Sequence, residues 1–443
     1  MIMKKNSVII GAMAVALAAL LWSLDGTFLR PRLYSLQPAL LVFLEHLLGF
    51  VALLPFLVVY RAQLKLIKRK EWVAIFWVAL FGGALGTIFI TKALFATGFK
   101  DISVVILLQK FQPIFAIILA AIFLRERFPR SFYFYAPLAL VAGYFVTFKN
   151  PFAVSSAMSA VPIAAGFSML AAFAWGSATT FGKYSLKNIS YGLLAALRFG
   201  LTVLIMAIPA ARYFSSLPSV GAAQWTTLII IVFTSGAAAM FLYYFGLKKI
   251  TASVATLCEL SWPVSAIILD YYLNGNALSA TQILGAAALA AAVTRIVFLH
   301  RSRVVAGAVL PGYGQGDKVG IHTANLDVAL AKNLPRGLYT CSVAFIANTP
   351  SFVLPLKRGG TTDSHPPLLG EGQGKGYSGL LYYGYNSLTK KDCLEVHVLN
   401  FAGDLYGKKI EARTERYLRL PKKFDSVESL AAQVAKDLKL VSE

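Results

Sequence analysis

A glycine-rich stretch followed by two polar side chains is the part of this sequence best suited to chemistry. Glycines recur at Gly312, Gly314 and Gly316, and Thr323 and Asn325 follow a few residues later. Glycine lets backbone N–H groups approach an anion closely, and a hydroxyl with an amide oxygen can complete the coordination of Mg²⁺. The stretch therefore predicts a site for a magnesium-bound phosphate.

The elements around this stretch are predicted to be strands. Alternating or β-branched and aromatic residues mark strands at 337–347, 377–385, 393–401 and 408–418. An apolar period of 3.6 residues over 426–440, behind a capping box of Asp425 and Glu428, marks a helix. Strands followed by one helix indicate a small barrel with a closing helix, over residues 304–443. A loop insertion rich in proline and glycine interrupts it near 348–376.

The first 303 residues have the composition of a membrane protein. Across the whole chain 57% of residues are hydrophobic and 14% are charged. Residues 1–303 hold 25 Lys and Arg against 7 Asp and Glu, whereas the remainder holds 17 against 13. The basic excess belongs to the loops between apolar segments, where it sets orientation and contacts anionic lipid, so we exclude nucleic acid as a partner. Three cysteines, Cys258, Cys341 and Cys393, form neither a metal pair nor a disulfide framework.

Ten apolar stretches are long enough to cross a bilayer as helices. They lie near 7–28, 36–59, 72–96, 101–123, 130–148, 160–182, 191–211, 223–246, 251–272 and 279–299. An even number of spans puts both termini on one side. The loops on that side carry 16 basic residues against five on the other, so both termini are predicted to be cytoplasmic, in an inner membrane.

An internal repeat divides the apolar part into residues 1–150 and 151–303. Trp22 and Phe28 in the first span parallel Trp175 and Phe181 in the sixth, and Pro113 parallels Pro263. Because each repeat has five spans, an odd number, the two repeats must be inverted relative to each other. Inverted repeats build alternating access around a site at the membrane midplane, so the pattern predicts a transporter.

These repeats resemble the drug/metabolite transporter superfamily, EamA-type branch. The resemblance covers residues 7–299 and is carried by a Trp in the first helix of each repeat and a Pro in each fourth helix, within 109–114 and 259–264. It implies a carrier of small solutes such as amino acids, nucleotide sugars, drugs or vitamins, and it allows a homodimer. The acidic residue of Leu124-Arg125-Glu126 has no counterpart at Asn274-Gly275-Asn276.

Polar and aromatic side chains inside the spans are candidates for contact with the solute or an ion. Ionisable groups are costly there, and Trp can stack on a flat solute. The candidates are Trp22, Glu45, Lys110, Trp175, Arg198 and Glu259. The alternative is that the charged ones pair with one another to fix helix packing. Asp25 and Lys92 lie nearer the span ends, where their side chains can reach the interface.

The tail resembles a riboflavin kinase over residues 304–440, apart from the insertion. The motifs are the glycine stretch with Thr323-Ala324-Asn325, then Gly337-Leu338-Tyr339, Leu394-Glu395-Val396-His397, Asp404-Leu405-Tyr406-Gly407 and Leu418-Arg419. The resemblance implies a six-stranded antiparallel Greek-key barrel that transfers the γ-phosphoryl group of ATP to riboflavin, giving FMN. No His-x-x-His or His-x-Gly-His signature of an adenylyltransferase is present, so the product is predicted to stop at FMN.

The same resemblance implies a role for each matching residue. Thr323 and Asn325 hold Mg²⁺ and the nucleotide phosphates, and Gly314 and Gly316 shape the flap over them. Glu395 is the catalytic base that takes the proton of the ribityl hydroxyl. Phosphoryl transfer needs charge neutralisation, positioning and one carboxylate near the nucleophile, which suits these residue types.

Three positions of the tail remain to be weighed. Arg419 contacts flavin or phosphate, or is an ordinary arginine ahead of a helix. Where the family has Pro before Thr-Ala-Asn this chain has His322, and Asp317 stands where a basic residue is usual. These departures favour an alternative in which the tail senses flavin and gates a carrier of another metabolite.

The two halves together predict a riboflavin importer fused to its own kinase. Mg-ATP would convert each entering riboflavin to FMN, a phosphate monoester that is trapped in the cytosol. A further alternative is an exporter of an unrelated metabolite that tethers an active kinase to the membrane.

Overall fold

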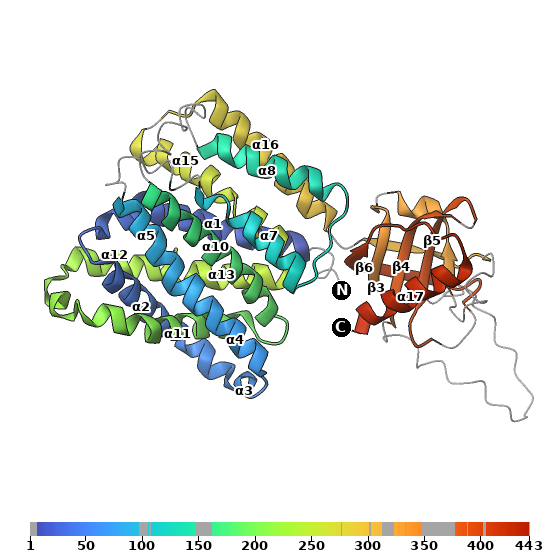
Figure 1. Cartoon of the computed structure of the whole chain (residues 1–443), viewed down its shortest axis with the longest axis horizontal. Coiled ribbons are helices and arrows are strands. Elements are labelled where there is room, and N and C mark those ends of the chain that lie inside the picture. The colour runs from blue at the N-terminus through green and yellow to red at the C-terminus, as the bar shows by residue number, and fades with distance from the viewer. Residues whose placement is uncertain are drawn as a thin grey trace, which may run out of the picture. The chain divides into compact units, whose positions relative to one another are not determined.

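The computed structural model describes residues 7–96, 105, 108–147, 162–275, 277–300, 303–311, 323–332, 334–346, 377–387, 389–401 and 405–442. The chain separates into a helical unit, Met1–Glu126 with Phe132–Arg301, and a sheet unit, Arg127–Ser131 with Ser302–Glu443 (Figure 1). Gly314, Gly316, Asp317, His322 and the insertion at 348–376 lie outside the described residues.

The helical unit consists of apolar helices. Its longer elements are α1 (Ser7–Leu24), α2 (Pro38–Val59), α5 (Gly86–Ala96), α7 (Gln112–Phe123), α8 (Phe132–Thr147), α10 (Pro162–Ser185), α11 (Tyr191–Ala211), α12 (Ala222–Phe233), α13 (Ala237–Lys249), α15 (Ser261–Asn274) and α16 (Ala280–Leu299). Shorter ones are α3 (Arg61–Leu64), α4 (Arg69–Trp77), α14 (Ala252–Cys258), the π-helical turns η2 (Asp25–Leu29) and η4 (Val78–Leu85), and the 3₁₀ turns η3 (Arg30–Leu33) and η5 (Phe214–Ser219).

Eight of the ten predicted spans are long and apolar enough to cross a membrane within the described part of the chain. These are Ser7–Leu33, Pro38–Val59, Arg69–Leu94, Pro162–Ser185, Tyr191–Ala211, Ala222–Lys249, Ala252–Leu273 and Ala280–Leu299. The described parts of the fourth and fifth spans are the shorter helices Gln112–Phe123 and Phe132–Thr147, whose crossing of the membrane stays a prediction.

The helix pairs recur when the two repeats are exchanged. The first span packs on the eighth (α1 with α13), and the sixth packs on the third (α10 with α5 and η4). The first also packs on the ninth (α1 with α15), as the sixth does on the fourth (α10 with α7). Equivalent spans meet each other, α2 with α11 and α8 with α16 (Figure 1). A two-fold relation between the repeats requires this pattern of pairs.

Two equivalent spans are broken near their middle. Lys110 and Phe111 form a turn ahead of α7, and Glu259 and Leu260 form a turn between α14 and α15. A proline follows each turn in the first turn of the next helix, where its missing N–H costs nothing. Irregular backbone at this depth is tolerated where it is buried in protein or lines a polar cavity. Lys110 and Glu259 are therefore each the first residue of the turn that breaks its span.

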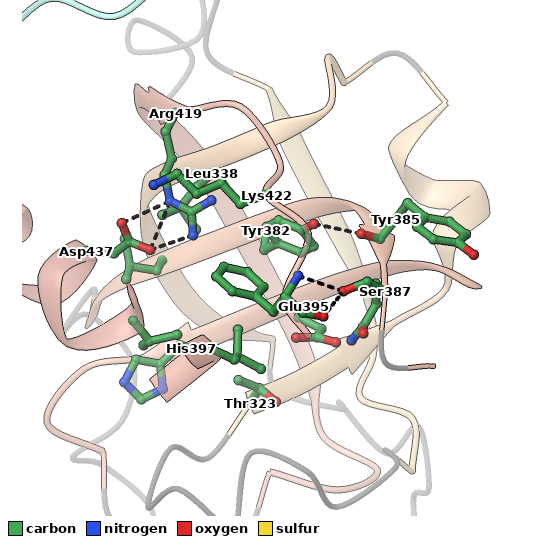
Figure 2. A pocket seen from close by; sticks show the side chains of 15 residues that line it. Thr323, Leu338, Tyr382, Tyr385, Ser387, Glu395, His397, Arg419, Lys422 and Asp437 are labelled. Atoms are coloured by element: carbon green, nitrogen blue, oxygen red, sulfur yellow. Dashed lines mark hydrogen bonds and ion pairs between the residues drawn. The ribbon is translucent and has the colours of Figure 1, made fainter. Parts of the chain in front are cut away.

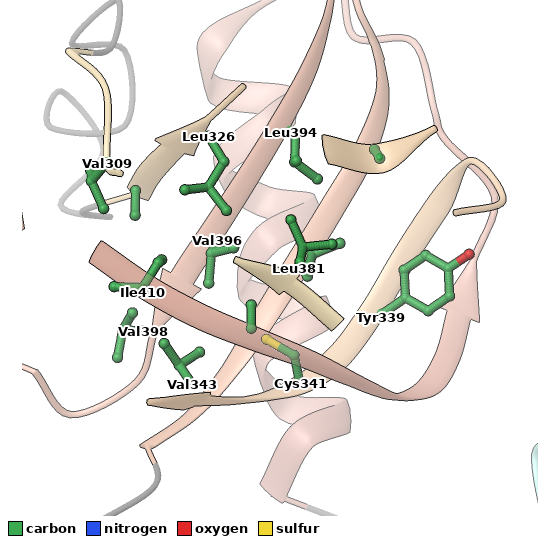
Figure 3. Close-up of a cluster of buried hydrophobic side chains, with 14 of the residues drawn as sticks. Val309, Leu326, Tyr339, Cys341, Val343, Leu381, Leu394, Val396, Val398 and Ile410 are labelled. Atoms are coloured by element: carbon green, nitrogen blue, oxygen red, sulfur yellow. The ribbon is translucent and has the colours of Figure 1, made fainter. Parts of the chain in front are cut away.

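The sheet unit is one antiparallel sheet of six strands. These are β1 (Val304–Ala308), β2 (Thr323–Leu326), β3 (Gly337–Ile346), β4 (Tyr377–Asn386), β5 (Lys391–Val398) and β6 (Lys409–Arg419), in the order β1-β6-β3-β4-β5-β2. An isolated bridge joins Leu310, just after β1, to Asn325 in β2, so the sheet curls until its two edges meet. Alternate side chains fill the concave side, including Val343, Leu381 and Val396 (Figure 3).

A helix covers part of the opposite face of the sheet. α17 (Val427–Ser442) follows β6, and Leu438 packs with Leu338, Leu380 and Leu418, three residues that alternate away from the main core. The four predicted strands match β3 to β6 within two residues at each end, except that β5 ends three residues earlier than predicted. β1 and β2 are too short to show an alternating pattern, and the Greek-key connection stays a prediction.

Candidate functional site

The pairing of β2 with β5 brings the predicted phosphate and base residues together. Thr323 lies opposite His397, and Asn325 lies opposite Glu395. Ala324 between them is fully buried in the core, so Thr323 and Asn325 point to the other face. Successive strand residues alternate between faces, and therefore the hydroxyl, the amide, the carboxylate and the imidazole share one side of the sheet.

This face forms the floor of a pocket beneath α17 (Figure 2). The empty space of the pocket, counting its open mouth, is about 710 Å³. Thr323, Glu395 and His397 line its polar side. The apolar wall consists of leucines, a valine and aromatic rings, namely Leu338, Leu380, Leu430, Val434, Tyr385 and Phe424. A ligand with a flat apolar ring and a polar tail fits this pocket, with the ring against the apolar wall and the tail at the polar side.

Burial raises the pKa of Glu395, and hydrogen bonds with the side chains of Cys393 and Asn386 partly oppose the shift. Burial also raises the pKa of its cross-strand neighbour Tyr382 to about 12. A carboxylate with a raised pKa is a better proton acceptor once it is ionised. Glu395 is therefore suited to take a proton from a hydroxyl bound in the pocket.

Thr323 and Asn325 present the oxygen donors that Mg²⁺ prefers. Both side chains are half-buried, and within the described residues neither has a hydrogen-bond partner. The carboxylate of Glu395 lies on the same face, across from Asn325. Mg²⁺ is held by one or two protein oxygens together with substrate phosphates and water, so these residues fit the ion.

Arg419 is held by an acidic residue that the sequence did not point to. Its Nε donates to both carboxylate oxygens of Asp437 at 3.0 Å, and its Nη2 donates to Oδ2 at 2.6 Å. Nη1 donates to the carbonyl of Leu420 at 3.1 Å. The pair joins the end of β6 to α17 at the pocket wall (Figure 2). Contact of Arg419 with flavin or phosphate stays a prediction.

Further pocket residues were not predicted as site residues from the sequence. Ser387 Oγ accepts from the backbone N–H of Phe424 at 2.9 Å and donates to its carbonyl at 2.7 Å. This clamp fixes the segment before α17 to the end of β4, and Tyr382 donates to the carbonyl of Tyr385 in the same corner. Tyr382 could have been identified from the sequence as a pocket residue, because it lies two residues after Leu380 in the same strand and so on the same face. No local sequence pattern marks Ser387.

In the helical unit, Glu259 is the centre of a polar cluster. Its carboxylate accepts from Nε2 of Gln112 at 2.6 Å and from the hydroxyl of Tyr243 at 2.8 Å. The Tyr243 hydroxyl also bonds Thr179 at 2.7 Å, and its ring centroid lies 5.4 Å from that of Trp22. Spans one, four, six, eight and nine thus converge on one half-buried carboxylate.

Lys110, Arg198 and Trp175 make other contacts. Lys110 Nζ lies 4.4 Å from the ring centroid of Trp262. Arg198 Nη2 donates to the carbonyl of Gly82 at 2.6 Å, and Trp175 Nε1 donates to the same oxygen at 3.2 Å. Gly82 leaves no room for a side chain, since an added Cβ would lie 2.7 Å from that of Ala178.

Glu45 forms an ion pair with a residue expected in a loop. Arg30 Nη2 lies 3.1 Å from Glu45 Oε1 and 2.8 Å from Asp25 Oδ2. Asp25, expected to reach the interface, is 8% exposed, because the π-helical turn η2 that it begins carries Arg30 back onto it. Within the described residues, none of the four ionisable candidates forms an ion pair with another.

Two families match this chain, in agreement with both resemblances. The EamA-like transporter family matches residues 9–148 and 162–298. The riboflavin kinase family matches residues 299–443. A solved crystal structure covers 67% of this chain and 98% of its own, at 15% identity and a TM-score of 0.53, which shows a shared fold.

Individual relatives divide in the same way. The riboflavin transporter ImpX of Fusobacterium nucleatum is 42% identical over 295 residues, which are 66% of this chain and 98% of that protein. A human riboflavin kinase is 31% identical over 30% of this chain and 74% of its own length. A bifunctional riboflavin kinase/FMN adenylyltransferase of Listeria monocytogenes is 29% identical over 30% of this chain and 34% of that protein.

Proposed function

We propose, from the premise that this chain belongs to the EamA-like transporter family and carries a riboflavin kinase domain at its carboxyl end, that it imports riboflavin and traps it as FMN. The observation that carries the proposal is the fusion itself. A membrane half 42% identical to a riboflavin transporter is joined to a domain that phosphorylates riboflavin. A kinase on the cytoplasmic side removes the transported solute and draws uptake inward.

The kinase step follows from the residues of the pocket. The apolar wall under α17 holds the flavin ring, and the ribityl chain extends toward Glu395 on the sheet. The oxygen of the 5′-hydroxyl attacks the γ-phosphorus of ATP while Glu395 accepts the hydroxyl proton. The bond between the γ-phosphorus and the ADP oxygen breaks. Thr323 and Asn325 hold Mg²⁺, which when bound neutralises charge on the phosphates. The products are FMN and ADP.

The transport site is proposed at the helix breaks of the helical unit. Glu259, with Gln112 and Tyr243, offers hydrogen bonds to a polar heteroaromatic edge, and Trp22 and Trp262 offer faces on which a flat ring can stack. Discontinuous helices at the interface of two repeats are where carriers bind their solutes. The excess of basic residues in alternate loops supports cytoplasmic termini in an inner membrane, where the kinase domain meets ATP.

Uptake of radiolabelled riboflavin into cells that lack their own importer tests this function. The intact chain is compared with the Glu395→Gln variant, and the label inside is separated into riboflavin and FMN. We expect accumulation as FMN with the intact chain, and equilibration as riboflavin with the variant. Uptake no greater than in empty cells by both proteins would refute the carrier, whereas uptake without FMN formation by the intact chain would refute trapping.

A further inference from the structure

Asp25, Arg30 and Glu45 form a buried cluster with one basic and two acidic side chains. Asp25 Oδ2 accepts from Arg30 Nε at 3.0 Å and from Nη2 at 2.8 Å, and Nη2 also lies 3.1 Å from Glu45 Oε1. Asp25 and Glu45 are each 8% exposed, and both belong to predicted membrane spans. One guanidinium is therefore shared by two carboxylates away from water.

The charges of this cluster do not balance. With all three groups ionised the cluster carries one excess negative charge, which is unfavourable in a buried membrane site. Asp25 Oδ1 is buried and has no hydrogen-bond partner, and Glu45 Oε1, also buried, has only the ion-pair contact with Arg30 Nη2. A buried polar oxygen without a partner is a place where a proton, an ion or a water molecule can bind. The ligand must be positively charged or donate a hydrogen.

No neighbouring side chain of the described residues supplies that charge. The other ionisable groups on η2, η3 and α2 and on the elements packed against them are Arg32, Tyr34, His46, Arg61, Lys92, Tyr191, Arg198, Tyr243, Tyr244, Lys248, Lys249, Asp270, Tyr271 and Tyr272, while α12 has none. Arg32 and Lys92 lie over the rings of Phe28 and Phe167, at 4.0 and 5.5 Å from their centroids. The His46 ring bonds the carbonyl of Val42, and Tyr34 lines a small pocket beside Arg30.

The backbone at the cluster is also irregular. Asp25 begins the π-helical turn η2, and the chain then continues as the 3₁₀ turn η3, which starts at Arg30. π-Helical turns are rare and occur frequently at functional sites. The irregular turn lets Asp25 and Arg30, five residues apart, meet on one side of the chain.

We propose that the Asp25–Arg30–Glu45 cluster is a proton-binding site that couples transport to a proton gradient. The proton forms an O–H bond with one carboxylate oxygen and cancels the excess negative charge. A metal ion is disfavoured because it would lie beside the guanidinium of Arg30, whose positive charge already faces both carboxylates. The proton enters with the solute and dissociates on the cytoplasmic side.

This inference rests on the proposed riboflavin carrier, and its test separates the two. The full chain is reconstituted in liposomes without ATP, so that the kinase cannot trap the solute. Exchange of labelled for unlabelled riboflavin at equal pH reports the carrier. Accumulation driven by an acidic outer solution reports coupling and is limited to about tenfold per pH unit for one proton. A sodium gradient is applied in a parallel experiment.

We expect pH-driven accumulation that a protonophore abolishes and that sodium does not replace. Asp25→Asn and Glu45→Gln should each retain exchange but lose pH-driven accumulation. Asp270→Asn, which removes a carboxylate outside the cluster, should retain both.

Absence of exchange by the intact chain would refute the carrier and this proposal with it. Exchange without a pH effect, sodium-driven accumulation, or pH-driven accumulation in Asp25→Asn and Glu45→Gln would refute the proton site alone. Loss of exchange in both of these variants would assign the cluster to solute binding or folding and would overturn the proton-site proposal. Loss of pH-driven accumulation in Asp270→Asn would overturn it as well, because the effect would then not be specific to the cluster.

Discussion

Replacing Glu395 by glutamine should abolish most of the kinase activity while leaving the fold intact. Glutamine keeps the size of the side chain and one accepting oxygen, but its amide cannot accept the hydroxyl proton. Because burial raises the pKa of Glu395, the folded protein is destabilised by ionisation of this group near neutral pH. The neutral variant should therefore be at least as stable as the original chain.

The size of the catalytic loss follows from what else lies in the pocket. The other acidic residue that lines it, Asp437, is committed to Arg419 through three hydrogen bonds. No second carboxylate among the described lining residues can take over the proton. A positioned general base contributes about 10²- to 10⁴-fold, so we expect kcat to fall about 10³-fold, or about 4 kcal/mol of barrier.

Formation of FMN by the purified full chain, followed chromatographically, measures this effect. The KM values for ATP and riboflavin should change little, because the proton transfer belongs to the transition state. Glu415→Gln, which removes an exposed acid from β6, is the matched control and should retain full activity. A kcat for Glu395→Gln within about threefold of the original would refute the assignment of Glu395 as the base.

Three further predictions concern the same domain. The kcat should fall as the pH is lowered through a pKa above the ordinary value for glutamate, because protonated Glu395 cannot act as a base. A pH–rate profile in which kcat does not fall at low pH would contradict the assignment of Glu395. Asn325→Ala should raise the Mg²⁺ concentration for half-maximal activity by about tenfold, measured by metal titration, and an unchanged requirement would exclude Asn325 as a ligand. Asp437→Asn should lower the free energy of unfolding of the kinase domain by about 3 kcal/mol, because Arg419, whose side chain is 15% exposed, then lacks its anionic partner. Equal denaturation midpoints for the variant and the original chain would contradict this prediction.

The sequence by itself determined the class of each half. A segment that crosses the bilayer must be apolar and must form its backbone hydrogen bonds within one helix, so such segments can be recognised as long apolar runs. The helices α10, α11 and α16 lie where those runs predicted them. The strands β3, β4 and β6 were predicted because alternation is a local property of a half-buried sheet. The motifs around Thr323 and Glu395 indicated the kinase family, which the family match confirmed.

Only the tertiary structure decided which side chains meet. The register of β2 on β5 set Asn325 opposite Glu395, and α17 supplied Asp437 to Arg419. In the membrane half the alternative to solute contact was that the candidate charges pair with one another, yet Glu45 pairs with Arg30. Register, helix packing and backbone turns such as η2 depend on contacts between residues distant in sequence, and the residue pattern along the chain carries no direct record of those contacts.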